Sequence, residues 1–549
     1  MKKYTVGRSQ SEGGRMLMKI MEEKKKAIYR AETILIIFCT ICCLVVLCFF
    51  NFCGFATFCN SDTYADCQVA IRMWEQKTLF PQGWTFGNQY YVIATPVLAA
   101  GLYGLIGDIN IAMPLATFIM TVLIFTSLIW MIKSFSSDIR EIAFGCFLLP
   151  ISVICVWGPS SLHSLLFFSQ ASFYACYLIT LFVVFGDYAR SFHSDKARPA
   201  AWGVSMLLCF ATGMQSLRQT AIMILPILAY ELFYRMRMVI TKQGKWTDNL
   251  RTLIRAISYA AANIFGVVLM KLFNIPSAPI YENDITASSE YWLQQIKTIG
   301  NALIEITSLD YILRGDFGKV LAVQIILMII LVLTAGVLWC SRIFRQENGL
   351  ELCWFLFLIG IFGICLASIT VGVTLRSIYL FMWFPMAALS GLIVIRKVPN
   401  IVRCGIFVVV CAVGVLSVLY GYQPYMHIIA DEMSYEVQLS QWACDNGYEY
   451  IYGEYWGTAP QIAVHSHGDL EAGCWHAVDN LFWVELSNTP QDIYGAEQNE
   501  KAIYVFNGAE EEKRALILAE ERGAILRKMI EFGDFEVYTA SEPLMRLRR

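Results

Sequence analysis

Long apolar runs recur along most of the chain and then stop. Runs of roughly 18–22 apolar residues, the length with which an α-helix crosses a bilayer, recur between Thr33 and Tyr420. From Gly421 to Arg549, charged, aromatic and glycine residues alternate and no such run remains. The pattern predicts membrane spans at Thr33–Cys53, Ile111–Ile132, Ile142–Trp157, Tyr174–Gly186, Trp202–Gly213 with its flanks, Ala221–Tyr234, Ala256–Phe273, Val320–Cys340, Cys353–Thr370, Ile378–Ile395 and Cys404–Tyr420.

Composition agrees with this pattern. The 549-residue chain is 57% hydrophobic and 16% charged, with a mean hydropathy of +0.53, as in an integral membrane protein. Nine Lys or Arg precede the first span, so this end is expected in the cytoplasm. No small-residue cleavage site follows Cys48, and we expect the first span to remain as an anchor. The expected domains are a basic N-terminus (1–31), a transmembrane domain (32–421) and a C-terminal domain (422–549).

The apolar segment Tyr90–Gly107 decides the topology. It holds Pro96 and several glycines, so it either spans the bilayer or lies at the interface. If it spans, the basic segments 187–199 and 341–346 fall on the outer side; if it does not, every basic loop, including Arg403, faces the cytoplasm. We therefore predict an α-helical polytopic membrane protein with about eleven spans. The segment is then interfacial or re-entrant, and the C-terminal domain is extracytoplasmic.

This topology gathers polar residues from distant parts of the sequence at the outer face. They lie in outer loops at 54–110 and 274–319, in a short outer segment at 158–172, and at the outer ends of two spans. The candidate site residues are Asp62, Asp66, His163, Arg218, Arg376 and Tyr379.

Two acids, Asp62 and Asp66, follow the first span. They lie in a predicted amphipathic helix at Asp62–Gln76, which Ser61 or Asp62 would cap. In one interpretation Asp62 merely caps the helix and Asp66 faces water. In the other, a carboxylate is held at the membrane surface to take a proton from an acceptor hydroxyl. Because acids at i and i+4 share a helix face, a divalent metal between them is a further alternative.

The sequence around these acids is SDTYADCQVAIRMWEQKTLFPQGW, residues 61–84. It resembles the first outer loop of the GT-C class of membrane glycosyltransferases, which includes the protein O-mannosyltransferase and aminoarabinose transferase families. Thr63 departs from the resemblance, because many relatives have a second acid there, and this leaves Asp62 as the single base. The positions that match the motif are Asp62, Tyr64–Ala65, Ala70, Met73 and Pro81.

The resemblance implies an activity as well as a fold. GT-C enzymes of this kind transfer a sugar from a lipid-phosphate donor. It therefore implies a polyprenyl-phosphate sugar donor, inversion, and a glycan, lipid or protein acceptor at the outer membrane face. Asp62 would be the general base. Asp66, one turn further on, would assist with the acceptor or a metal, or have no role. An interfacial helix before the second span and an extracytoplasmic C-terminal domain are also expected of this class.

Two arginines suit the lipid-phosphate donor. A guanidinium such as that of Arg218 or Arg376 binds phosphate bidentately and stabilises charge on the leaving oxygen. The alternative is an arginine that extends to lipid headgroups. Tyr379 lies one turn after Arg376 and would support it or belong to an aromatic belt. His163 would contact sugar or phosphate, or lie at the surface.

The C-terminal domain is predicted to be α/β. The segments YEYIYG, AIYVFN and DFEVYTA have strand patterns, and EEEKRALILAEERG has that of an amphipathic helix. The histidines of HSHGDLEAGCWH match metal spacing only superficially and are interpreted as a solvated loop. Cys444 and Cys474 are a candidate disulfide. No P-loop, dinucleotide fingerprint or nucleic-acid-binding motif is evident, and no nucleic-acid partner is expected.

The sequence favours a GT-C-like glycosyltransferase of the cell membrane. The alternative is a transporter, flippase or polymerase of lipid-linked glycans. Ion-coupled carriers usually hold ionisable residues inside the membrane and often contain inverted repeats. The predicted spans are almost free of such residues and no repeat is evident, so a transferase is preferred.

Overall fold

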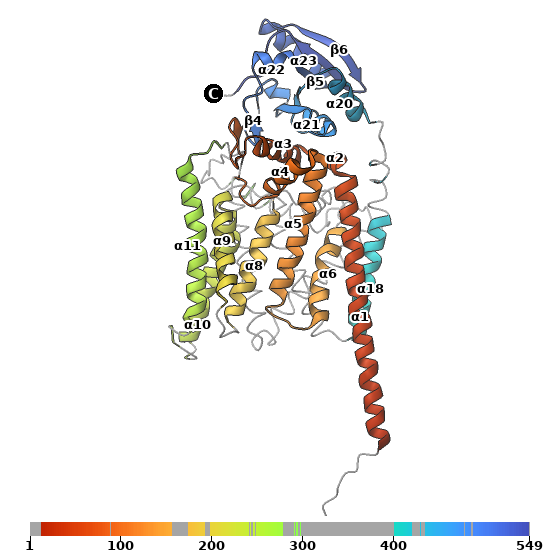
Figure 1. The fold of residues 1–549 in the computed structure, drawn as a ribbon, viewed down its shortest axis with the longest axis vertical. Helices are drawn as coiled ribbons and strands as arrows, with labels where there is room; N and C mark the ends of the chain where they lie inside the picture. Colours follow the sequence, from red (N-terminus) through yellow and green to blue (C-terminus); the bar gives the residue numbers. More distant parts are fainter. Residues whose placement is uncertain are drawn as a thin grey trace, which may run out of the picture.

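Figure 1 shows a bundle of long helices with the C-terminal domain stacked on one end. Two short helices, α3 (Ser61–Glu75) and α4 (Thr95–Ile106), lie between the bundle and the domain. The structure is a computed structural model. It describes residues 12–155, 174–192, 198–277, 400–419 and 434–547, apart from gaps at 88, within 241–248, at 477 and at 485–486, and it also describes scattered residues within 290–297 and 426–429.

Helices occupy the predicted spans that fall within the described residues. The bundle helices are α1 (Glu12–Cys53), α5 (Ile109–Ile132), α6 (Ile139–Cys155), α8 (Ala175–Ser191), α9 (Pro199–Gln215), α10 (Leu225–Ile240), α11 (Leu250–Phe273) and α18 (Asn400–Ser417). By length and composition α1, α5 and α11 suffice to cross a membrane. Apolar side chains such as Phe38 and Phe265 are exposed on them, as expected of a surface in lipid. Three predicted spans, 320–340, 353–370 and 378–395, lie outside the described residues, so the count of eleven stays a prediction.

Small residues let α9 and α11 pack closely. A Cβ on Gly213 would lie 2.2 Å from the backbone oxygen of Asn263, and one on Gly266 would lie 2.2 Å from that of Phe210. The side-chain amide of Asn263 also donates to the backbone carbonyl of Cys209 across this contact, at 3.0 Å. Close backbone approach with a polar side chain bonded across the interface is a common way for helices to associate in a bilayer.

Contrary to the expectation of almost uncharged spans, the bundle buries a charged network. Glu231 and Arg235 on α10 are each 2% exposed and form an ion pair at 2.7 Å. Tyr188 of α8 and Thr252 of α11 donate to the same carboxylate at 2.6 and 2.8 Å. Because the partners come from α8, α10 and α11, the network holds these three helices together. The buried charge therefore has a structural role in the bundle.

The helix predicted at 62–76 is confirmed as α3. Its N-cap, however, is Asn60 and not Ser61 or Asp62. Asn60 has an extended backbone, and its side-chain oxygen accepts a hydrogen bond from the Thr63 amide at 2.8 Å. The prediction was wrong because Asn, Ser and Asp are similarly good caps and the helix begins one residue earlier. The interpretation of Asp62 as merely the helix cap is therefore excluded.

Helix α4 does not run through the bundle. It has 12 residues, about 18 Å at 1.5 Å per residue, against roughly 30 Å of hydrocarbon. Before it, the Ile93 amide donates to Gln215 at 2.7 Å; beyond it, Asp108 contacts His467 of the C-terminal domain at 3.0 Å. Tyr91 also contacts the domain, donating to Asn488 at 3.4 Å. Both ends of α4 thus lie at the domain end of the bundle, in agreement with an interfacial helix.

The C-terminal domain is α/β within the described residues, as predicted. Its elements are α20 (Tyr435–Asp445), β2 (Tyr450–Glu454), α21 (Ala459–Ala463), β3 (Glu471–Trp475), β4 (Thr489–Pro490), α22 (Ala496–Glu500), β5 (Ala502–Asn507), α23 (Ala509–Glu521), β6 (Leu526–Phe532) and β7 (Phe535–Ala540). Five strands form a sheet in the order β3-β2-β5-β7-β6. Strand β2 is parallel to β3 and β5, whereas β7 is antiparallel to β5 and β6. Cys444 and Cys474 are free thiols, so the candidate disulfide is not formed.

We predict that positions 85 and 108, on either side of α4, are accessible from the same side of the membrane. An impermeant maleimide should label Thr85→Cys and Asp108→Cys equally in intact cells or oriented vesicles. Lys133→Cys, at the other end of α5, is the matched control and should react only after permeabilisation. Labelling of position 108 together with 133, rather than with 85, would show that α4 spans the bilayer.

Candidate active site

One face of α3 is bonded along its length to the C-terminal domain. Ser61, Tyr64, Gln68 and Arg72 follow one another at helical spacing, so their side chains project from the same face. Ser61 donates to the carbonyl of Tyr455, Tyr64 to that of Leu470 at 2.8 Å, and Gln68 to that of Ala472 at 3.1 Å. We call these four residues the docking stripe of α3.

Arg72 is the charged end of the docking stripe. Its guanidinium is 10% exposed and binds two carboxylates, Glu471 at 2.6 Å and Asp492 at 2.8 Å. Burial alone would lower the pKa of Arg72, but the hydrogen bonds and charges of Asp492 and Glu471 outweigh burial and raise it. Arg72 therefore remains a cation that two acids of the C-terminal domain hold.

The loop after α3 joins the same interface. Strand β1 (Trp84–Thr85) pairs antiparallel with β4, and the Gln491 amide donates to the Gly83 carbonyl at 2.7 Å. Gly83 has φ of +73°, and a Cβ there would lie 2.4 Å from the Asp492 carboxylate. Only glycine fits this turn, and the turn brings the loop alongside the acid that holds Arg72.

The two candidate acids lie in different environments, and Asp66 does not face water as one interpretation expected. Asp62 is partly exposed, and the Tyr455 hydroxyl donates to its Oδ1 at 3.2 Å. Asp66 is 0% exposed and does not face water, because Tyr91 packs against it. Burial raises the pKa of the Tyr91 phenol, and the Asp66 and Asp62 carboxylates raise it further. Tyr91 thus remains protonated and can donate to a carboxylate.

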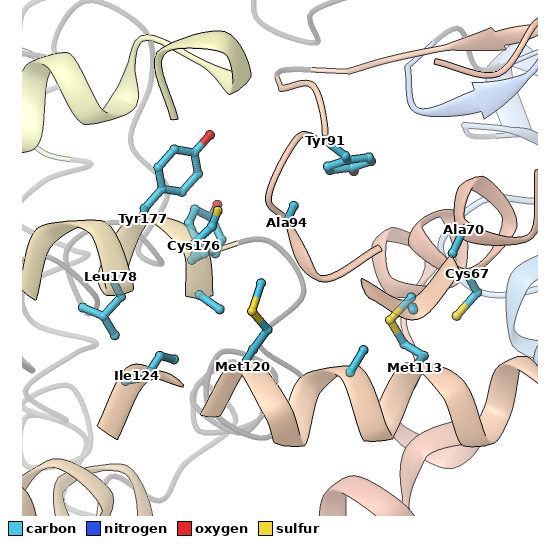
Figure 2. Packing of buried hydrophobic residues seen from close by; sticks show 14 of the residues in the cluster. Cys67, Ala70, Tyr91, Ala94, Met113, Met120, Ile124, Cys176, Tyr177 and Leu178 are labelled. Atoms are coloured by element: carbon cyan, nitrogen blue, oxygen red, sulfur yellow. The ribbon is translucent and has the colours of Figure 1, made fainter. Parts of the chain in front are cut away.

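The segment that carries Tyr91 connects the acids to the bundle. Figure 2 shows Tyr91 and Ala94 on a loop between the helix that bears Ala70 and the helix that bears Tyr177. The Tyr90 amide donates to the Gln215 carbonyl at 3.0 Å, just beside Tyr91. The loop therefore spans from α3 to the domain end of α9.

Arg218 lies at this same end of the bundle, three residues beyond the end of α9. It is partly exposed, its backbone amide donates to Ser216 at 3.3 Å, and its guanidinium lies 5.0 Å from the Tyr174 ring centroid. A π-helical turn, Thr220–Ile224, follows it. Such turns are rare and often occur at functional sites. Asp62 and Arg218 thus lie at the same end of the bundle, and their convergence on one site stays a prediction.

The other predicted site residues cannot be placed. His163, Arg376 and Tyr379 lie outside the described residues. The approach of Arg376 to Arg218 and the supporting roles of the other two therefore stay predictions.

Three residues of this region were not among the sequence-based candidates. Arg72 had a readable signal, because Ser61, Tyr64, Gln68 and Arg72 form a polar stripe at helical spacing. Tyr91 had no such signal in the sequence, since it lies in an apolar segment. Tyr455 is one of many aromatics in its domain, and its contact with Asp62 depends on how the domain docks.

No metal site is evident in the part of the chain that the structure describes, where no three His, Cys, Asp or Glu side chains gather suitably. His467 of the segment interpreted as a solvated loop is 60% exposed and pairs with Asp108. A cleft of about 560 Å³ lies between α3 and the C-terminal domain. Its lining includes Arg72 and Glu471 of the docking interface but neither Asp62 nor Asp66, so it is distinct from the acids.

Comparison with known proteins identifies the fold. No protein-family model matches the sequence, and no curated protein matches it either. Among solved structures, ArnT from Cupriavidus metallidurans bound to undecaprenyl phosphate is similar with a TM-score of 0.50 and 12% identity, over 93% of this chain and 98% of that chain. The same protein in its apo state gives 0.51 and 11%, with the same coverage. The chain therefore has an ArnT-like GT-C fold, as the resemblance of the acid-containing loop predicted.

We predict that Arg72 holds the C-terminal domain on α3. Arg72→Ala leaves Glu471 and Asp492 without their cation. Loss of one partner of such a pair costs about 2–5 kcal/mol where the pair is buried. Because the Asp492 side chain is partly exposed, we expect the lower end of this range. Hydrogen–deuterium exchange of the docking interface should increase. Lys501→Ala, which removes an exposed pair with Glu449, is the control and should change exchange little. Equal protection in both variants would contradict the assigned role of Arg72.

Proposed function

We propose that this protein is a membrane glycosyltransferase that moves a sugar from a polyprenyl-phosphate donor to an acceptor at the outer membrane face, with inversion. The observation that carries the proposal is a partly exposed carboxylate, Asp62, on an interfacial helix of an ArnT-like GT-C fold. ArnT, a GT-C aminoarabinose transferase, has been crystallised with undecaprenyl phosphate. A lipid carrier of that kind suits a site at the end of a membrane bundle.

Asp62 and Asp66 have separate roles in this proposal. A general base must reach the hydroxyl that it deprotonates. Asp62 is partly exposed, whereas Asp66 is fully buried against Tyr91. Asp62 is therefore the base. Asp66 acts indirectly, because it holds Tyr91 and the loop that runs from α3 to α9.

Arg218 is the proposed ligand of the donor phosphate. A sugar that leaves a polyprenyl phosphate leaves negative charge on the phosphate oxygens, and a guanidinium stabilises that charge. Arg218 is partly exposed at the domain end of α9, where a phosphate at the membrane surface would lie. Arg376 is proposed as a second ligand on the strength of its sequence position, and Tyr379 and His163 as supporting residues.

The rival proposal is a transporter or flippase of lipid-linked glycans. Its support would be ionisable groups along a path through the membrane. Buried charges of the bundle pair across its helices: Glu231 with Arg235, Tyr188 and Thr252, and Asp187 with Arg255 and Tyr259. They explain helix packing, so the transferase is preferred.

We predict that Asp62→Asn folds and binds donor but loses most transfer. A positioned base contributes about 10²–10⁴-fold, and the amide cannot accept the proton. The measurement is release of undecaprenyl phosphate by the full-length protein in proteoliposomes, with a panel of undecaprenyl-phosphate sugars as donors. Asp66→Asn is the matched comparison and should cost much less. Transfer by Asp62→Asn at near wild-type rate would reject Asp62 as the base.

We predict that Arg218→Gln weakens donor binding. Removal of one charged hydrogen-bonding partner of a phosphate costs about 1.5–3 kcal/mol, which corresponds to roughly 10- to 150-fold in the dissociation constant. Binding of undecaprenyl phosphate to purified protein measures this directly. Arg237→Gln, on α10 and away from the proposed site, is the control. An unchanged affinity in Arg218→Gln would reject Arg218 as a phosphate ligand and support the alternative, in which this arginine extends to lipid headgroups.

A further inference from the structure

An aromatic cluster of the C-terminal domain lies beside the proposed base. Tyr455, which donates to Asp62, is 7% exposed, and the Trp456 ring packs against it at 4.9 Å. His476 lies 6.1 Å from Trp456 and 6.3 Å from Tyr455, between ring centroids. Trp456 is 47% exposed, and His476 is also exposed. Two of the three rings thus face solvent, and the third contacts the carboxylate.

The cluster occupies a position where α/β sheets commonly bind ligands. Tyr455 and Trp456 follow the carboxyl end of β2, and His476 follows that of the parallel strand β3. Strand β2 lies between β3 and β5 and is parallel to both, so the Tyr455–Trp456 turn leaves the carboxyl end of a strand inside the sheet. In open α/β sheets, ligands commonly bind outside the carboxyl ends of the parallel strands.

The backbone beneath the cluster is held firmly. The Tyr455 amide donates to the Trp475 carbonyl at 2.8 Å, which joins the ends of β2 and β3. The Gly457 amide donates to Glu454 at 2.6 Å, and Gln461 donates to the Trp456 carbonyl at 3.2 Å. Ser61 of α3 bonds the Tyr455 carbonyl. The Trp456 indole is therefore exposed on a fixed turn, where little entropy is lost when a ligand covers it.

We propose that Trp456 and His476 form the acceptor-binding surface of the C-terminal domain, and that the acceptor is a carbohydrate. This inference rests on the proposed function. The proposed base must touch the acceptor hydroxyl, so groups that adjoin the base on the domain side meet the acceptor rather than the lipid donor. A sugar ring presents a face of C–H bonds with partial positive charge, which complements the negative face of an aromatic ring.

The first test is binding of the full-length, detergent-purified protein to an array of defined envelope oligosaccharides, which requires no turnover. Wild type should bind a subset of them, and Trp456→Ala should bind about three- to tenfold more weakly, the range expected for loss of one aromatic contact. Trp456→Phe should retain binding, since it keeps a ring. Trp483→Ala removes a 37% exposed tryptophan elsewhere in the domain and should match wild type.

The second test separates this inference from the proposed function. In a transfer assay, Trp456→Ala should raise the acceptor KM by the same three- to tenfold and leave donor affinity unchanged. Transfer that depends on Asp62 but not on Trp456 would overturn the acceptor surface and keep the transferase. Glycan binding that depends on Trp456 without any transfer would keep the surface and reject the transferase. Absence of glycan binding by wild type, or equal loss in Trp483→Ala, would overturn the inference.

Discussion

The docking of the C-terminal domain on α3 is the interaction on which the rest of the site depends. Four side chains of one helix face, from Ser61 to Arg72, bond to the domain, and the Arg72 ion pairs close the contact at its far end. Because these bonds run along three turns of the helix, they fix its rotation as well as its position. The direction in which every other residue of α3 points follows from that rotation.

The acids illustrate this dependence. Asp62 and Asp66 are four residues apart, yet one is partly exposed and the other is buried. Spacing along the helix does not distinguish them. The difference arises from what covers each turn: the edge of the C-terminal domain reaches Asp62 through Tyr455, whereas Tyr91 covers Asp66. A buried carboxylate is costly without a polar neighbour, and the Tyr91 phenol is the polar group that adjoins Asp66.

The sequence predicted what depends on local periodicity and missed what depends on docking. Apolar runs located the bundle helices, and strand patterns located β2, β5 and β7, since these features follow from the hydrophobic period of each segment. The N-cap of α3 was predicted at Ser61 or Asp62 but is Asn60, because Asn, Ser and Asp are similarly good caps and lie side by side in the sequence. The contact of Tyr455 with Asp62 joins residues that are far apart in the chain. No local pattern encodes it, and it requires the register of the whole interface.

The layered arrangement of the molecule has a consequence for the proposed chemistry. Inversion requires the attacking oxygen and the departing phosphate on opposite sides of the anomeric carbon, roughly in line. In the structure α3 lies between the bundle and the C-terminal domain, and Arg218 follows the end of α9 within the bundle. In the proposed reaction, a base on α3 that also contacts the domain approaches from the domain side, and a carrier phosphate anchored in lipid approaches from the bundle side. The docking stripe contributes to this arrangement by holding α3, the helix that carries the proposed base, against the C-terminal domain.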